Sequence, residues 1–403
     1  MTPQLPGAGS LGAQRPSAWR YIFAGLCASL ASIGLARFAY TPLLPSLIQA
    51  HWFATSDAVY LGAANLMGYL IGALIGRPLA RHLSNAHTLR LMMVIVTAAF
   101  FACGYPLSVA WFFVWRLLSG IAGGAVMVLV AATVMPHVPG ERKGLVSGAL
   151  FLGLGLGIAA SGTIVPLLLN IGLRETWLGL GVLSAVLTAA TWSLWPSSAA
   201  HAAAAQTPPA TASEPAPAVV RLLYVQYAVM AFGVVPTMVF LVDFIARGLH
   251  AGAHLGALCW VLYGVGAIAG PPVYGALADR LGGAVSIRIV MLAQAVLAAL
   301  LAMSHSRLAI GALAVLIGSF PPGIVPLMLA RVHEVIPGNH ARQNLAWSRA
   351  TILFAACQAI AGYAYSSVFN ASGGNHRVLF ALGAVAFVLC VCCDLFVPRA
   401  ARK

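Results

Sequence analysis

Long apolar runs, separated by short polar segments, dominate this chain. Each run has the length of a helix that crosses a hydrocarbon layer of about 30 Å at about 1.5 Å per residue. The runs are rich in Gly, Ala, Leu and Val, and they lack the alternation of a membrane β-barrel. We therefore predict an all-α polytopic membrane protein, because helices satisfy every backbone amide inside lipid. The twelve predicted transmembrane helices cover about 19–47, 57–80, 87–106, 109–137, 142–170, 175–196, 220–247, 252–279, 285–304, 307–336, 341–369 and 376–397.

A longer polar segment divides these spans into two groups of six. Its Ala, Pro, Ser and Thr residues build no core and are typical of a flexible linker. The predicted organisation is a cytoplasmic tail over 1–18, a six-helix bundle over 19–196, a cytoplasmic linker over 197–219, a second six-helix bundle over 220–397 and a tail over 398–403.

A constant offset of 198 residues relates the two groups. The segment Gly275–Gly283 reads Gly-Ala-Leu-Ala-Asp-Arg-Leu-Gly-Gly, and a weaker copy precedes it at this offset. The same shift pairs Ala278 with Ala80 and Gly318 with Gly120. A repeat of this length indicates a duplicated half-protein, so we predict two pseudo-symmetric bundles.

The distribution of charge predicts the orientation. Only 7% of the 403 residues are charged, and the net charge is +14. Fifteen of the 22 Lys and Arg residues fall on the segments that share a side with the N-terminus, and four fall on the opposite side. This asymmetry predicts cytoplasmic termini in a bacterial inner membrane. It favours contact with anionic membrane lipid, and no motif for nucleic acid accompanies it.

No motif indicates an enzyme or a cofactor. The sequence has no phosphate-binding loop, no Gly-x-Ser-x-Gly and no His-Glu-x-x-His. All seven cysteines lie in apolar spans without metal-ligand spacing, and the eleven histidines lie near loops and helix ends without a convincing cluster.

The chain resembles the major facilitator superfamily (MFS) over nearly its full length, and three segments carry this resemblance. Gly275–Gly282 resembles the loop signature of that superfamily, and Trp115–Gly120 resembles its fourth-helix signature. The segment Gly34–Pro45 is similar to the first helix of YbfB/YjiJ-like transporters. The resemblance implies the MFS fold, in which two bundles rock around a midplane site. In the first half, Ser84 stands where the loop signature has Gly, and Arg81 stands where it has Asp.

The resemblance also implies roles for individual residues. Asp279 and Arg280 match the signature residues that latch the cytoplasmic side of MFS transporters, and Arg349 is a candidate partner of Asp279. Because helices 1, 4, 7 and 10 line the central cavity of that fold, the substrate-cavity candidates are Arg37, Tyr40, Arg116, Gln226 and Tyr227.

Arg37 and Arg116 are the two cations expected at cavity depth. A buried Arg suits a carboxylate or phosphate, because its donors form a planar fork. Alternatives stay open for both: Arg37 as a gate or packing pair, for instance with Asp243, and Arg116 as a group that bonds helix carbonyls. Asp243 and Arg247 stand four residues apart, and we expect them to form a solvated pair at a helix end rather than a proton site.

These features predict a secondary active transporter of a small solute, with an organic anion or zwitterion as the substrate class. Because the sequence has no nucleotide site, the energy for transport has to come from a gradient of protons, of another ion or of the substrate itself. We expect a monomer. One alternative is proton-driven efflux of hydrophobic compounds, and another is a membrane sensor or scaffold that carries no flux.

Overall fold

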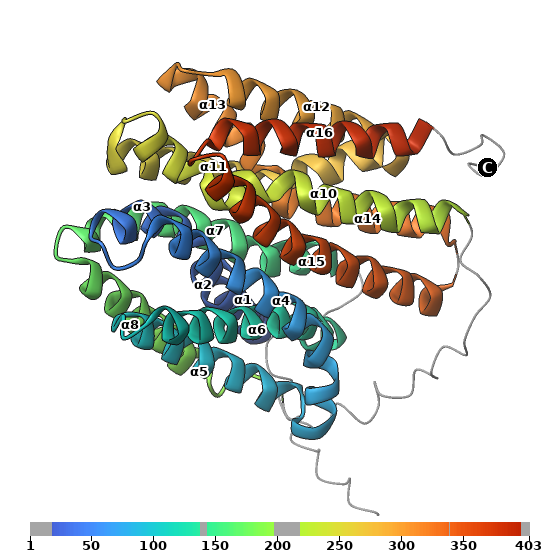
Figure 1. Cartoon of the computed structure of the whole chain (residues 1–403). Coiled ribbons are helices and arrows are strands. Elements are labelled where there is room, and N and C mark those ends of the chain that lie inside the picture. The colour runs from blue at the N-terminus through green and yellow to red at the C-terminus, as the bar shows by residue number, and fades with distance from the viewer. Residues whose placement is uncertain (1–17, 138–142, 197–217, 338, 396–403) are drawn as a thin grey trace, which may run out of the picture.

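The computed structural model describes residues 18–137, 143–196, 218–337 and 339–395, and these ranges contain helices and no strand (Figure 1). The predicted tails and nearly all of the predicted linker lie outside them. The first half consists of α1 (Ala18–Ser29), the π-helix η1 (Leu30–Leu35), α2 (Ala36–Phe38), α3 (Tyr40–Gln49), α4 (Thr55–Leu83), α5 (Asn85–Cys103), α6 (Val109–Val134), the 3-10 turn η2 (Met135–His137), α7 (Lys143–Leu169) and α8 (Leu173–Thr191). The second half consists of α10 (Ala218–Asp243), the π-helix η5 (Phe244–Gly248), α11 (Gly252–Leu281), α12 (Gly283–Met303), α13 (Arg307–Gly318), α14 (Phe320–Val335), α15 (His340–Ala371) and α16 (His376–Leu395).

Eleven helical stretches in the described part of the chain are long and apolar enough to cross a membrane. They match the predicted spans except the one at about 175–196, where the structure has α8. The 19 residues of α8 include Arg174 and Glu175 in its first turn, which shortens its apolar stretch. Val186, Leu292 and Ile360 are more than half exposed, and such an apolar surface suits lipid. The chain is therefore a multi-pass membrane protein.

The helices form two bundles that lie side by side (Figure 1). In the first bundle α4 packs on α6, and α5 packs on α6 and α8; in the second α11 packs on α13 and α14, and α12 packs on α16. The most extensive contacts between the bundles are those of α3 with α10, α4 with α15, and α7 with α11. We call the side where α10 begins and α16 ends the terminal side, and the opposite side, next to α3, the distal side.

The offset of 198 residues reappears in the packing of glycines. A Cβ atom added at Gly120 would collide with the carbonyl oxygen of Asn65, and one added at Gly318 would collide with that of Tyr263. Both members of the second pair lie 198 positions after those of the first. Two further contacts between a glycine and a carbonyl oxygen are repeated at this offset. The contact of Gly68 with Leu117 recurs as Gly266 with Val315, and that of Gly72 with Ile121 recurs as Gly270 with Ser319. Small residues permit such close helix contacts. The two bundles thus repeat one set of helix crossings, which confirms their predicted pseudo-symmetry.

Hydrogen bonds join the bundles toward the distal ends of the spans. Thr41 Oγ1 on α3 donates to the carbonyl oxygen of Met238 on α10 at 2.6 Å. Trp260 Nε1 on α11 donates to Ser161 Oγ on α7 at 3.0 Å. Both bonds are buried, and they hold the distal ends of the bundles together in this structure.

Candidate functional site

Arg37 lies near the middle of the first span, Trp19–Gln49, directly after a stretch of irregular helix. The residues Leu30–Leu35 are π-helical, a geometry that is frequent at functional sites. Arg37 is half-buried, and its Nε and Nη2 atoms are buried without a hydrogen-bond partner among the described residues. These two nitrogens form one edge of the guanidinium, and such an edge can bind a carboxylate through two parallel hydrogen bonds. Arg37 therefore presents an unused anion-binding edge.

Aromatic rings from both bundles surround this guanidinium. Its central carbon lies 5.1 Å from the ring centre of Tyr69 and 5.4 Å from that of Phe38. Tyr263, from the second bundle, is close enough to interact with Arg37 electrostatically. An Arg at the centre of a membrane helix costs about 2.5–3.5 kcal/mol, and the aromatic faces offset part of that cost. The cation is thus placed where the two bundles meet.

The second bundle adds more aromatic surface near Tyr69. Tyr227 on α10 lies in the neighbourhood of Tyr69, and its ring centre is 4.5 Å from that of Phe354 on α15. Tyr263 on α11 stacks on Trp260, with ring centres 4.8 Å apart. Of the predicted cavity residues, Arg37 and Tyr227 therefore lie around the same aromatic region.

Two buried polar atoms of the second bundle also have no partner among the described residues. They are the hydroxyl of Tyr263 and Oε1 of Gln358. The amide nitrogen of Gln358 points to the sulfur of Met238 at 3.7 Å. A buried polar group without a hydrogen bond costs about 1–3 kcal/mol. Both groups are thus available to a polar ligand between the bundles.

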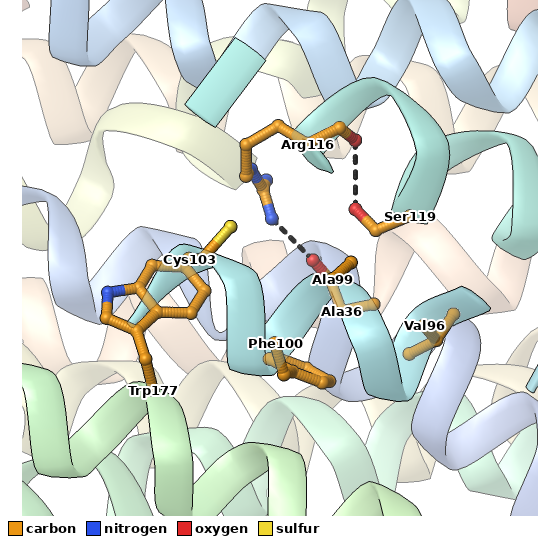
Figure 2. Close-up of a pocket in the computed structure, with 8 residues that line it drawn as sticks. All are labelled: Ala36, Val96, Ala99, Phe100, Cys103, Arg116, Ser119 and Trp177. Atoms are coloured by element: carbon orange, nitrogen blue, oxygen red, sulfur yellow. Dashed lines mark hydrogen bonds between the residues drawn. The ribbon is translucent and has the colours of Figure 1, made fainter. Parts of the chain in front are cut away.

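Arg116 lies inside the first bundle, beside Ala36 and a small pocket (Figure 2). Its Nη1 donates to the carbonyl oxygen of Ala36 at 2.7 Å, and its guanidinium carbon lies 4.3 Å from the ring centre of Tyr40. It borders a cavity of about 10 Å³ with Cys103 and Trp177, which has room for about one water molecule. This geometry fits the alternative in which Arg116 bonds a helix carbonyl, because its bond to Ala36 holds α6 against the backbone next to Arg37.

The hydrogen bonds of Tyr40 and Gln226 lie within their own bundles. The hydroxyl of Tyr40 donates to the carbonyl oxygen of Ala58 at 2.6 Å, which ties α3 to α4. Gln226 is buried, and its backbone carbonyl oxygen accepts from the thiol of Cys390 on α16 at 3.7 Å. Neither residue contacts Arg37 through a hydrogen bond.

The three latch candidates lie at the terminal side and are exposed. Asp279 and Arg280 occupy the end of α11, and Arg349 is near Tyr224 of α10. Within the part of the chain that the structure describes, Asp279 and Arg349 form no ion pair with each other. The structure thus shows these residues apart on a side that is not latched by them.

Asp243 and Arg247 form the predicted pair, but the expectation that the pair is solvated is wrong for Asp243. Its side chain is fully buried, and its two oxygens accept from Arg247 Nε at 2.5 Å and Nη2 at 2.6 Å. His376 Nε2 is 2.7 Å from Asp243 Oδ2, so the expectation that no histidine joins a cluster is also wrong. This histidine begins α16, and no local sequence pattern links it to α10. Asp243 does not pair with Arg37.

Comparisons with known proteins agree with the fold. The model of a family described as the uncharacterised MFS-type transporter YbfB matches residues 29–395. The chain is 29% identical over 181 residues to a gallate transporter of Pseudomonas putida, which covers 45% of this chain and 40% of that protein. It is 26% identical over 149 residues to the 4-hydroxybenzoate transporter PcaK of Acinetobacter baylyi, covering 37% of this chain and 33% of that protein.

A third relative is the MFS-type transporter mpsC of Macrophomina phaseolina, which is 29% identical over 117 residues, or 28% of this chain and 23% of that protein. The match thus spans less than half the length of each of these relatives. The family model, by contrast, extends from the first span to the last helix and includes both bundles. This chain belongs to the YbfB-like family of MFS transporters.

Proposed function

We propose that this MFS transporter carries a small aromatic carboxylate, which binds Arg37 between the two bundles. Alternating access moves the bundles around this site. The observation that carries the proposal is the buried edge of Arg37, whose Nε and Nη2 have no partner among the described residues. A carboxylate would supply two charge-assisted hydrogen bonds to that edge.

The surroundings favour an aromatic ring on the bound anion. Tyr69 and Phe38 flank the guanidinium, and Tyr227 and Tyr263 bring aromatic surface from the second bundle. Offset or edge-to-face ring pairs contribute about 0.5–1.5 kcal/mol each. Ring hydroxyls of a substrate could satisfy the Tyr263 hydroxyl and Gln358 Oε1. Two relatives are transporters of gallate and of 4-hydroxybenzoate, which are hydroxylated aromatic carboxylates.

We further propose that both termini face the cytoplasm of a bacterial cell, so that the distal side faces outward. The distribution of Lys and Arg supports this orientation. The distal hydrogen bonds then describe an inward-facing arrangement. In the opposite state, Asp279 and Arg280 at the end of α11 and Arg349 on α15 would come together and latch the cytoplasmic side. Two separated partners in the present state are compatible with that cycle.

Counterflow in proteoliposomes tests the substrate class. The vesicles are loaded with unlabelled 4-hydroxybenzoate, and entry of the labelled compound is followed; gallate, benzoate and the neutral 4-hydroxybenzamide serve as competitors. We expect the carboxylates to compete and the amide to compete at least about tenfold less well, since it lacks the charge that Arg37 binds.

Arg37→Gln is expected to reduce counterflow about 10–100-fold, the loss associated with about 1.5–3 kcal/mol for hydrogen bonds to a charged group. The matched control is Arg307→Gln, which removes an exposed cation at the distal side. Equal competition by the amide and the acids, or full activity of Arg37→Gln, would contradict the proposal.

A further inference from the structure

A second cluster of charged groups lies outside the candidate substrate site, at the distal end of α10. Asp243 is fully buried at the point where α10 passes into η5. Arg247, one turn later, binds both of its oxygens, and His376 of α16 binds Oδ2 through Nε2 at 2.7 Å. An ionisable residue inside a membrane span is expensive and is usually functional. The cluster therefore calls for an explanation beyond packing.

The hydrogen bonds indicate which tautomer of neutral His376 fits the cluster. Both oxygens of Asp243 accept from Arg247, which is the arrangement of a carboxylate. His376 Nε2 has to carry a hydrogen to donate to this carboxylate, so in neutral imidazole Nδ1 keeps a free lone pair. The cluster then holds one negative and one positive charge, and its net charge is zero.

The free nitrogen of His376 can be reached from the distal surface. A Cβ added at Gly248 would lie 3.0 Å from His376 Nδ1, so this atom is next to Gly248. Gly248, Arg247 and His376 line an open hollow of about 490 Å³, together with Thr55 and Ser56 of the first bundle. Water in this hollow can deliver a proton to Nδ1 without passing through the substrate site.

Few other charged groups lie near the imidazole of His376. Phe244 and Phe369 pack on its ring at 5.8 and 4.8 Å between centres. Arg377, the next residue of α16, lies over Phe244 and donates to the carbonyl oxygen of Ala302 at 2.7 Å. From the first bundle, α4 presents Asp57 in its first turn. Among the described residues, Asp243 and Arg247 are thus the charges that act on His376 through direct contact or a shared partner.

We propose that His376 and Asp243 form a proton-binding site that controls the distal gate of this transporter. A proton from water in the hollow binds Nδ1 of His376, and the net charge of the cluster rises from zero to +1. The bond from Nε2 to Asp243 then joins two ions, so attraction between opposite charges is added to a hydrogen bond whose acceptor was already charged. When the proton returns to water, the cluster is neutral again and the bond weakens.

The bond acts on the gate through α10. Asp243 lies five residues beyond Met238 in the chain, and the carbonyl oxygen of Met238 accepts the Thr41 hydrogen bond that joins the bundles. Fixing Asp243 to α16 keeps this part of α10 in the position that the bond to α3 requires. Proton binding is therefore expected to favour the state in which the distal side is closed.

Spin labels on the two bundles test this proposal without any substrate. Ile171 and Ala371 are exposed residues beside the distal loops, one in each bundle. They are changed to Cys after the seven native cysteines have been replaced, and electron–electron distances are measured in lipid nanodiscs. We expect the ratio of short to long distances to rise about fivefold from about pH 8 to about pH 5, the range in which histidine titrates.

His376→Gln keeps a donor toward Asp243 and removes the titrating nitrogen, so its distances are expected to be independent of pH. His254→Gln, at an exposed histidine of α11, is the matched control and should respond like the parent. If His376→Gln does not give monodisperse protein, Asp243→Asn replaces it, and the same loss of response is expected.

A parent protein whose distances do not change with pH would overturn the proposal, and so would a His376→Gln protein that keeps the full response. Because no substrate is present, a transporter that fails the counterflow assay with every aromatic carboxylate can still pass this test. The two proposals therefore fail independently.

Discussion

Ser84 adopts the backbone conformation of Gly282, the residue 198 positions later: φ and ψ are 71° and 157° at Ser84, and 77° and 157° at Gly282. Each residue links a long helix to the next one, α4 to α5 and α11 to α12. The repeat thus conserves a turn with positive φ even where the glycine has been replaced. A side chain in this region costs about 1–3 kcal/mol, so the first half carries strain that the second half avoids.

Replacing Ser84 with Gly is expected to stabilise the protein by about 1 kcal/mol, because relief of strain exceeds the loss of a weak cap. The cap is the contact of Ser84 Oγ with the amide of His87 at 3.4 Å. Gly282→Ala should destabilise it by about 1–3 kcal/mol. Thermal unfolding in detergent measures both changes. Gly275→Ala is the control, because Gly275 is inside α11 and a Cβ there meets no atom within 4 Å. A Gly282→Ala protein as stable as the parent would contradict the assignment of strain.

The repeated helix crossing predicts matched effects in the two bundles. Gly120→Ala and Gly318→Ala each place a methyl group against a backbone carbonyl, of Asn65 and Tyr263 respectively. Backbone cannot move aside as a side chain can, so we expect each change to destabilise the protein by about 3 kcal/mol or more. The yield of monodisperse protein and its melting temperature report the effect.

Gly311→Ala is the control for that pair, since it lies on α13 with Gly318 and its Cβ would meet only Leu262 Cδ1 at 3.4 Å. Should Gly318→Ala behave like Gly311→Ala, the close crossing of α11 and α13 would be disproved.

The spans could be predicted from the sequence because the membrane imposes their length and composition. The predicted span at 142–170, for example, corresponds to α7 at Lys143–Leu169. The span predicted at 175–196 corresponds to α8, which is outside the eleven candidate spans of the described chain because two charges stand at its start. Inside a bundle, however, helices are apolar on all sides. Composition therefore does not reveal which face meets the other bundle.

The candidate site shows this limit. Arg37 could be singled out because an Arg in the middle of a span needs a special environment. Arg116 could be singled out for the same reason, yet it bonds to Ala36 inside its own bundle. To distinguish the surroundings of Arg37 from those of Arg116, one has to know how each helix is oriented about its own axis. The local sequence does not encode that orientation. His376 was missed because it follows Asp243 by 133 residues and meets it only through packing of α16 on α10.

Arg116 is expected to stabilise the first bundle. Arg116→Gln leaves the carbonyl of Ala36 without its donor and removes the cation from the face of Tyr40, which together should cost about 2–4 kcal/mol. Thermal unfolding of the purified variant measures this cost. Arg174→Gln is a close control, because Arg174 also lies 4.3 Å from a tyrosine ring centre, that of Tyr105, but is exposed. Equal stability of the two variants would show that Arg116 is not a structural cation.

The bond from Thr41 to Met238 should shift the balance between the two states of the transporter. Thr41→Val keeps the shape of the side chain and removes the donor, leaving a buried carbonyl oxygen with one partner fewer. A net loss of about 1 kcal/mol in the distal-closed state corresponds to about a fivefold shift toward the distal-open state. Distances between spin labels at Ile171→Cys and Ala371→Cys report that population. Thr163→Val is the control, since the hydroxyl of Thr163 bonds only within its own helix, to the carbonyl of Ala159 at 3.1 Å. Thr41 is buried between α3 and α10, whereas Thr163 is exposed. A shift toward the distal-open state in Thr41→Val alone would assign the effect to the contact between the bundles. The same shift in both variants would show that it comes from the loss of a hydroxyl in general.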